Sequence, residues 1–293
     1  MNLFNKNIDD KWNNYYIIKY LDEFIELYKE RPIKDNTGGM KFPHMFGLFF
    51  LLKHLKPDFV VESGIYKGQS TWLIEKTLPN VDLLSLDPHL NSRKYISESN
   101  KVKYSNLDFT EQDFSNISKN ALVFFDDHQN FYKRLVYANF FGFKHIIGED
   151  NYPVTQGDTY SFKKIFSGTG LNDRRASLKT LIKSILILSK HTLFKKLNKN
   201  YTNVIQKYDL SIQDVAKTEN HFKNLNKIIE TYFEFPPIFK TQYTRWGDLW
   251  DEKNYPTKEP LLTDVNIEKH KNIYEESNTY NWMCYIKFVN DQN

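Results

Sequence analysis

Residues 59–87 read FVVESGIYKGQSTWLIEKTLPNVDLLSLD, and this stretch decides the fold class. Its apolar runs at 59–62 and 82–87 have the length of buried strands, and residues 70–77 between them have helical spacing. A strand, a glycine-bearing turn, a helix and a second strand form the unit that joins neighbouring parallel strands.

The same alternation continues along the chain. Further strands are predicted at 101–106 (KVKYSN), 121–126 (ALVFFD) and 145–149 (HIIGE), with a helix at 130–140. Short apolar strands that alternate with helices indicate a mostly parallel sheet buried on both faces, a doubly wound α/β fold. The last strand, 280–289 (YNWMCYIKFV), is expected to join the edge of that sheet.

Length and composition limit the class of protein. The 293 residues, 40% of them hydrophobic, suffice for one large domain with an insertion. The one cysteine, Cys284, excludes a disulfide framework within the chain and a cysteine-based zinc cluster. The start at 1–10 is unlike a secretory signal, and the apolar run at 45–52 is too short to span a bilayer. We therefore expect a cytoplasmic protein without a transmembrane segment.

Three parts are expected along the chain. Residues 1–42 form an N-terminal helical extension, 43–164 together with 228–293 form the α/β domain, and 165–227 form a basic helical insertion. Within it, residues 171–200 carry eight Lys and Arg against one acid. This segment is interpreted as a solvated helix, as a contact for an acidic substrate, or as a segment on an anionic membrane surface. Because no reader motif accompanies it and the net charge is only +4, no nucleic-acid partner is expected.

The turn after the first strand carries the pattern E-x-G-x-x-x-G-x-S at residues 62–70. In doubly wound sheets ligands bind beyond the carboxyl ends of the strands, where the next helix, with Ser70 or Thr71 as N-cap, offers N–H groups. Asp87 ends the second strand, where an acid can accept both hydroxyls of a ribose. The alternative is structural, a capped turn and an Asp before Pro88 that forms another turn. Together the two features favour an adenosine-containing ligand.

Acidic residues also follow the next two strands, Asp126 and Asp127 after one, Glu149 and Asp150 after the other. Adjacent parallel strands end at the same edge of a sheet, so these carboxylates are expected to converge and repel one another. A divalent cation, Mg²⁺ or Mn²⁺, would remove the repulsion. The alternative is that each acid caps its own strand end and turns toward solvent.

Three histidines are expected near the same edge of the sheet. His128 is interpreted either as a general base or as a residue that orients Asp127. His44 and His89, each beside a proline, are weaker candidates.

The glycine turn and Asp87 resemble the class I S-adenosylmethionine-dependent methyltransferases, over residues 40–153 and the final strand. The resemblance implies a seven-stranded Rossmann-like methyltransferase fold and S-adenosylmethionine as cofactor. The commoner form of the motif has glycine where Tyr66 stands here. The implied cofactor-binding residues are Glu62 and Gly64 at the methionine portion with Ser63 between them, Gly68, Ser70 and Thr71 at its carboxylate, Asp87 at the ribose, and Asp108 or alternatively Asp113 at the adenine amino group.

The two acidic segments resemble the metal-dependent O-methyltransferases of the cephalosporin-hydroxylase-like and macrocin-type branch, a resemblance that does not extend into residues 165–279. It implies Asp127, Glu149 and Asp150 as metal ligands, with Asp126 as the alternative to Asp127, and His128 or Asp126 as the catalytic base. The expected function is metal-assisted methylation of a hydroxyl on a sugar, nucleotide-linked or polysaccharide acceptor in carbohydrate biosynthesis. A metal-independent small-molecule methyltransferase and a catalytically silent binding scaffold are the alternatives, and a homo-oligomer is left open.

Overall fold

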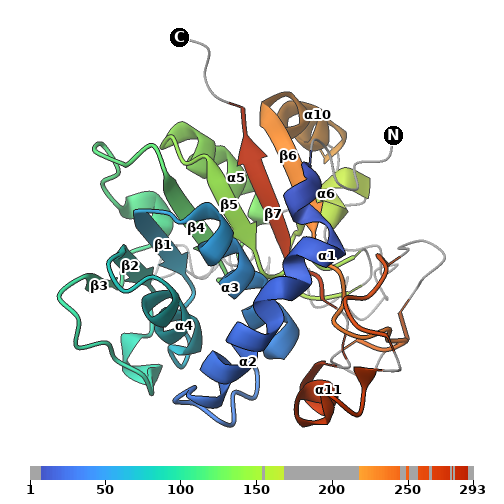
Figure 1. Cartoon of the computed structure of the whole chain (residues 1–293). Helices are drawn as coiled ribbons and strands as arrows, with labels where there is room; N and C mark the ends of the chain where they lie inside the picture. The colour runs from blue at the N-terminus through green and yellow to red at the C-terminus, as the bar shows by residue number, and fades with distance from the viewer. Residues whose placement is uncertain are drawn as a thin grey trace, which may run out of the picture. The chain divides into compact units, whose positions relative to one another are not determined.

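The computed structural model describes residues 8–153, 156–167, 218–244, 249–250, 257–263, 266–277, 279 and 281–289. The chain divides into two compact units. One is formed by Met1–His128, Leu135–Asn151 and Ile228–Asn293, and the other by Gln129–Arg134 and Tyr152–Lys227. The first unit contains the sheet (Figure 1). Most of the predicted insertion 165–227, including its basic segment 171–200, lies outside the described residues.

The described residues form one seven-stranded sheet in the order β3-β2-β1-β4-β5-β7-β6. Its strands are β1 (Phe59–Ser63), β2 (Asp82–Leu86), β3 (Val102–Ser105), β4 (Ala121–Phe125), β5 (His145–Gly148), β6 (Ile229–Glu234) and β7 (Cys284–Phe288). β1 to β5 pair in parallel, and β7 runs antiparallel to both of its neighbours. The prediction of a doubly wound, mostly parallel, Rossmann-like methyltransferase fold is confirmed.

The end of the sheet differs from the prediction. β7 was expected at the edge, but it lies between β5 and β6, and β6 was not predicted at all. β7 pairs along its length with β5 on one side and with β6 on the other, so it is an inner strand of the sheet. The sequence of β6, IETYFE, is rich in β-branched and aromatic residues, which is the signal that could have identified it.

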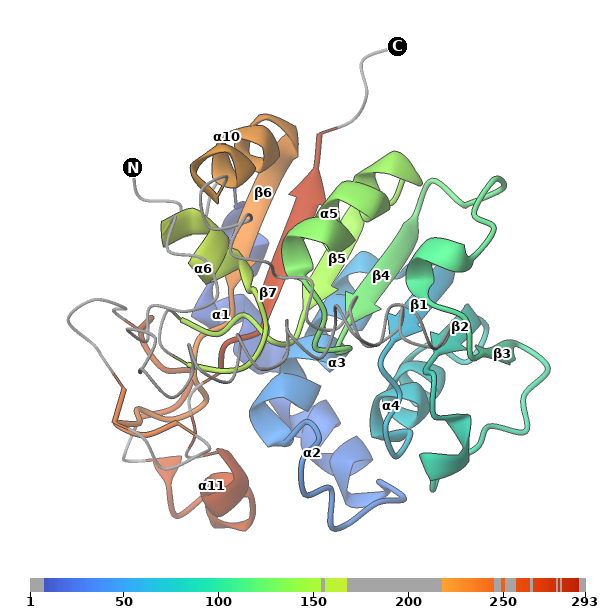
Figure 2. The same ribbon diagram turned by 180° about the vertical axis from the view of Figure 1, so that it is seen from behind.

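Helices cover both faces of the sheet. On one face α3 (Phe42–Leu55) packs against α4 (Gln69–Thr77) and α2 (Leu21–Lys29), as Figure 1 shows. The part of α5 (Phe131–Phe140) from Leu135 on lies on the other face (Figure 2). The first eleven residues of α3 are all buried, which is why this helix is apolar around its whole circumference. The remaining helices are η1 (Asp10–Trp12), α1 (Asn14–Ile17), η2 (Ile18–Tyr20), η3 (Leu90–Ser92), η4 (Phe109–Glu111), α6 (Phe162–Ser167), α10 (Thr218–Ile228) and α11 (Lys271–Ser277).

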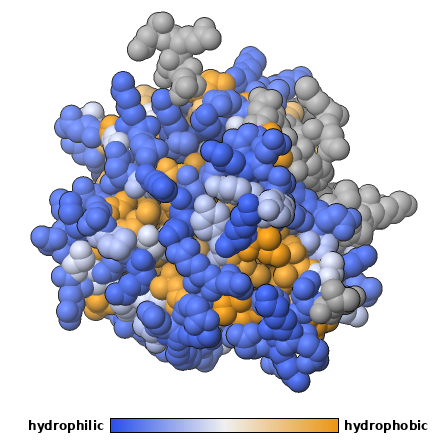
Figure 3. Space-filling view, viewed as in Figure 1, coloured by the Kyte–Doolittle hydropathy of each residue, from blue (hydrophilic) through white to orange (hydrophobic). Residues whose placement is uncertain are grey.

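The face of the molecule in Figure 3 is mostly hydrophilic. Hydrophilic residues cover most of the face in Figure 3, and hydrophobic residues show between them in separate patches. No helix among the described residues is long and apolar enough to cross a membrane.

The strand order defines where a ligand would bind. β2 and β3 lie on one side of β1, whereas β4 and β5 lie on the other. The topological switch point is therefore the crevice between the carboxyl ends of β1 and β4, the usual ligand position in doubly wound sheets.

Candidate active site

The turn between β1 and α4 needs glycine at two positions. Gly64 and Gly68 have φ angles of 99° and 92°, in the left-handed region that side chains disfavour. A Cβ atom on Gly64 would lie 2.1 Å from the carbonyl oxygen of Asp126, and one on Gly68 would lie 2.6 Å from that of Tyr95. Tyr66, which replaces the glycine of the commoner motif, also has a left-handed φ of 49°. Gly64 therefore packs closely against the segment that follows β4, and Gly68 against the segment between β2 and β3.

Glu62 belongs to the core. Its side chain is fully buried, and its Oε2 accepts hydrogen bonds of 2.6 Å from the hydroxyl groups of Thr71 and Ser85. Burial raises the pKa of Glu62, and the hydrogen bonds from neighbouring hydroxyls oppose that rise. The carboxyl group thus ties β1 to α4 and β2.

The start of α4 differs in detail from the prediction. The N-cap is Gly68, so the prediction that Ser70 or Thr71 caps this helix is wrong. Both residues lie in the first turn and are buried. The helix nevertheless begins directly after the glycine turn, with its positive dipole end at the switch point.

Asp87 closes the same turn from the second strand. Its Oδ2 accepts hydrogen bonds of 3.0 Å from the backbone N–H groups of Ile65 and Tyr66. Its Oδ1 accepts one of 2.7 Å from the N–H of His89. The carboxylate is half-buried, so it both shapes the turn and lies at the rim where a ribose was predicted.

The two acids predicted near an adenine have local partners. Asp108 caps η4, and together with Glu111 it forms a capping box. Asp113 is also hydrogen-bonded in its own turn, where the backbone N–H of Ser115 lowers the pKa of its carboxyl group. Both acids thus contribute to turns of the chain, and their predicted contact with an adenine stays a prediction.

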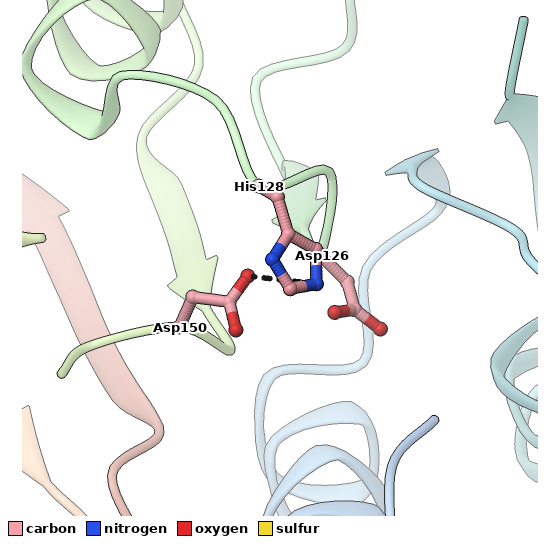
Figure 4. Close-up of side chains that lie close together, drawn as sticks. All are labelled: Asp126, His128 and Asp150. Carbon is pink, nitrogen blue, oxygen red and sulfur yellow. Dashed lines mark ion pairs between the residues drawn. The ribbon is translucent and has the colours of Figure 1, made fainter. Parts of the chain in front are cut away.

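A cluster of three side chains forms beyond the ends of β4 and β5. Asp126, His128 and Asp150 each offer one ligand atom, and these atoms all lie within 4.8 Å of one another. Figure 4 shows Asp150 and His128 directed toward each other from neighbouring strand ends, with His128 Nε2 3.7 Å from Asp150 Oδ2. His128 has a left-handed φ of 53°, an unfavourable conformation of the kind that collects at functional sites.

The other two predicted ligands have different partners. Asp127 Oδ2 accepts a 2.6 Å hydrogen bond from the hydroxyl of Ser63, at the end of β1. Glu149 is buried and hydrogen-bonded to Nδ1 of His44, in the first turn of α3. The set that the structure brings together therefore differs from the predicted ligand set of Asp127, Glu149 and Asp150.

The difference lies in what each acid contacts. Asp126 and His128 contribute to the cluster with Asp150, whereas Asp127, which lies between them in the chain, bonds to Ser63. His44, which was only a weak candidate from the sequence, is the hydrogen-bond partner of Glu149. The two residues are 105 positions apart in the chain.

The cluster has the donor chemistry of a divalent cation site. Two carboxylates supply hard oxygen ligands, and an imidazole supplies nitrogen, a set that suits Mn²⁺ better than Mg²⁺. The Asp150 side chain is 9% exposed and that of His128 is 45% exposed, so the cluster is open to solvent on the histidine side. These residues fit the predicted cation.

Comparisons with known proteins found similar solved structures but no matching family. No protein-family model and no curated protein matches the chain. A SAH-bound methyltransferase from Podospora anserina, PaMTH1, is 11% identical, with 94% of this chain and 93% of that chain covered and a TM-score of 0.41. An O-methyltransferase from Bacillus cereus in complex with SAH is 15% identical, with 61% and 87% covered and a TM-score of 0.30.

Two solved structures of CmcI are also similar. One, described with Mg and SAM, is 17% identical over 43% of this chain, with a TM-score of 0.32. The chain spans 65% of the length of that structure and 62% of the length of another, described with SAH. Identities and TM-scores this low do not establish a shared function.

Proposed function

We propose that this protein is an S-adenosylmethionine-dependent O-methyltransferase assisted by a divalent metal. The observation that carries the proposal is the convergence of Asp126, His128 and Asp150 beside the glycine turn of the switch point. A nucleoside donor on the β1 side and an activated acceptor on the β4 side would then meet at one crevice.

The residues of the β1 side suit the donor. The turn from Gly64 to Gly68 lets backbone come close to a ligand, and the N-terminal end of α4 attracts a carboxylate. Asp87 at the rim can accept ribose hydroxyls with the oxygen lone pairs that its backbone bonds leave. When bound, S-adenosylmethionine would supply a methyl group on a positively charged sulfur.

The residues of the β4 and β5 side suit the acceptor. Asp126, His128 and Asp150 would hold the cation, which when bound would lower the pKa of an acceptor hydroxyl. The reaction would form a bond between the acceptor oxygen and the methyl carbon, break the carbon–sulfur bond and pass the hydroxyl proton to water, because the cluster is open to solvent on the His128 side. The protein mainly has to position the oxygen in line with the methyl group.

The acceptor that we propose is a hydroxyl of a sugar or of a nucleotide-linked or polysaccharide chain. One support is that the cluster is open to solvent on the His128 side, where a hydroxyl of a large acceptor can reach it. The second support is the resemblance of the glycine turn, with Tyr66 in place of the commoner glycine, to variants found among sugar and antibiotic O-methyltransferases.

One observation favours a second candidate, a metal-independent methyltransferase. His128 Nε2 lies 3.7 Å from Asp150 Oδ2, so Asp150 could orient His128 as a general base. In that case His128 would remove the acceptor proton without a cation, and the acidic residues around it would bind hydroxyls of the acceptor.

Chelation separates these candidates. We expect the protein to bind S-adenosylmethionine in calorimetry, to lose methyl transfer after treatment with EDTA and dialysis, and to regain it with Mn²⁺. Full activity after chelation would favour His128 as base and remove the metal role. No binding at millimolar donor would overturn the methyltransferase proposal and favour a binding scaffold.

A further inference from the structure

Asp150 lies at the tip of a very short turn. The N–H of Asn151 donates to the carbonyl oxygen of Glu149 at 3.1 Å, which is the bond of a three-residue γ-turn with Asp150 in the middle. One such bond does not hold a loop in place by itself. The contacts of the residues on either side therefore contribute to the position of the Asp150 carboxylate.

The residue before Asp150 is attached to α3. Glu149 is 1% exposed and bonds to Nδ1 of His44, which is 3% exposed. The other ring nitrogen of His44, Nε2, accepts the backbone N–H of Trp282 at 3.4 Å. An imidazole that accepts at Nε2 donates from Nδ1, so His44 links the turn to the segment that leads into β7.

The residue after Asp150 is attached to β6. The side-chain amide of Asn151, which is 1% exposed, donates to the hydroxyl of Tyr232 at 2.9 Å. That hydroxyl in turn donates to the buried carboxylate of Glu234. Burial raises the pKa of Tyr232, so its hydroxyl keeps the proton that this chain of bonds requires.

We propose that His44 and Tyr232 are positioning residues for Asp150. They hold the two ends of the γ-turn through Glu149 and Asn151, and so aim the carboxylate at Asp126 and His128. This rests on the proposed function only for the identity of what the cluster binds. Each link is a long-range contact from the loop after β5, because His44 belongs to α3 and Tyr232 to β6.

The chain offers a matched control for Tyr232. Tyr285 in β7 is also a buried tyrosine, and its hydroxyl bonds to Nδ1 of His145 at 2.7 Å. His145 begins β5, at the strand end opposite to Asp150. Tyr232→Phe and Tyr285→Phe therefore each remove one buried hydroxyl from the same sheet, but only the first removes a link to the turn.

Two readouts test the proposal in the full chain. The first is hydrogen exchange, followed by mass spectrometry, of peptides that cover residues 146–153. The second is the dissociation constant for Mn²⁺ alone, measured by electron paramagnetic resonance. We expect Tyr232→Phe to accelerate exchange in these peptides and to weaken Mn²⁺ binding about tenfold. Tyr285→Phe should change neither, even though both variants lower the melting temperature.

His44 is tested by rescue. In His44→Asn the side-chain amide can occupy the place of Nδ1 and keep the bond to Glu149, whereas His44→Phe cannot. We expect the asparagine variant to retain most of the Mn²⁺ affinity and slow exchange that the phenylalanine variant loses. Should His44→Phe fail to fold, the comparison of Tyr232→Phe with Tyr285→Phe still decides whether the γ-turn is held through Asn151.

The outcomes separate this proposal from the proposed function. If Tyr232→Phe and Tyr285→Phe show the same exchange in residues 146–153, the positioning role is overturned. If the wild-type protein binds no Mn²⁺, the metal-assisted function fails, and exchange alone then decides whether His44 and Tyr232 hold the turn.

Discussion

The carboxyl edge of the sheet has two halves that look alike in sequence and differ in structure. In the β1–β2 half, Glu62 and Asp87 are held by hydroxyl and backbone N–H groups of the chain. In the β4–β5 half, Asp126, His128 and Asp150 converge on one another. An acid at a strand end is thus a weak indicator of chemistry, and the groups around its oxygens decide whether it stabilises the fold or forms a site.

The largest effect is expected for a charge removed from the β4–β5 half. Asp150→Asn keeps the shape of the side chain but removes a negative ligand, so methyl transfer should fall about a thousandfold, or about 4 kcal/mol in activation free energy. Turnover measured at saturating donor and Mn²⁺ checks this.

Asp82→Asn is the control for Asp150→Asn, because Asp82 is an exposed carboxylate paired with Lys101 on the surface. It should leave turnover within about twofold of wild type, since exposed pairs contribute little. Near-normal turnover of Asp150→Asn would show that the cluster is as structural as Glu62.

The contact between the two halves is tested at Gly64. In Gly64→Ala the new Cβ meets the carbonyl oxygen of Asp126 at 2.1 Å and the backbone keeps a φ of 99°, so unfolding free energy should fall by about 3 kcal/mol. Gly142→Ala is the control, since Gly142 has φ 87° but its Cβ would lie 3.8 Å from the nearest side-chain atom, in Ile117.

Gly142→Ala should lower the unfolding free energy, measured in urea, by only about 1 kcal/mol, which is the cost of a side chain at a left-handed φ without a clash. Equal losses in Gly64→Ala and Gly142→Ala would mean that the turn and the segment after β4 do not depend on their close approach.

The structural role of Glu62 predicts a dependence on pH. Burial raises the pKa of Glu62 in the folded protein, so the protonated carboxyl group stabilises the fold. This stabilisation is complete below the ordinary glutamate pKa and is lost as the pH rises through the folded-state pKa. In that window the wild type should lose about 1.4 kcal/mol of unfolding free energy per pH unit relative to Glu62→Gln, which has no proton to lose.

Urea unfolding of both proteins from pH 4.5 upward measures the difference. Glu26→Gln, at an exposed position, should run parallel to the wild type. A constant difference between wild type and Glu62→Gln over the whole range would contradict the raised pKa.

Strand periodicity was enough to predict the sheet, because each βαβ unit is local in sequence. It placed Glu62, Asp87, Asp126 and Asp150 at strand ends, as the structure has them. It did not identify β6, whose neighbour in the sheet is contributed by residues some fifty positions later in the chain.

The composition of the cluster could not be predicted from spacing alone. The sequence left the choice between Asp126 and Asp127 open, because it depends on the turn after β4, where His128 has a left-handed φ of 53°. The partners His44 and Tyr232 could not be predicted either, since each lies far along the chain from the residue that it holds. Such contacts depend on how helices and strands pack, which no local pattern encodes.

The smallest effect concerns Ser63, the residue that joins the two halves by donating to Asp127 at 2.6 Å. Ser63→Ala removes that bond and should lower the unfolding free energy by about 1 kcal/mol. If Asp126 is the ligand, the dissociation constant for Mn²⁺ should stay within about threefold of wild type, because Asp127 then serves only to fasten β1 to the end of β4. If Asp127 is the ligand, as the resemblance implied, Ser63 orients a metal-binding carboxylate and its loss should weaken Mn²⁺ binding tenfold or more, since such supporting hydrogen bonds typically contribute about that much. The same variant therefore measures which of two neighbouring aspartates belongs to the fold and which to the site.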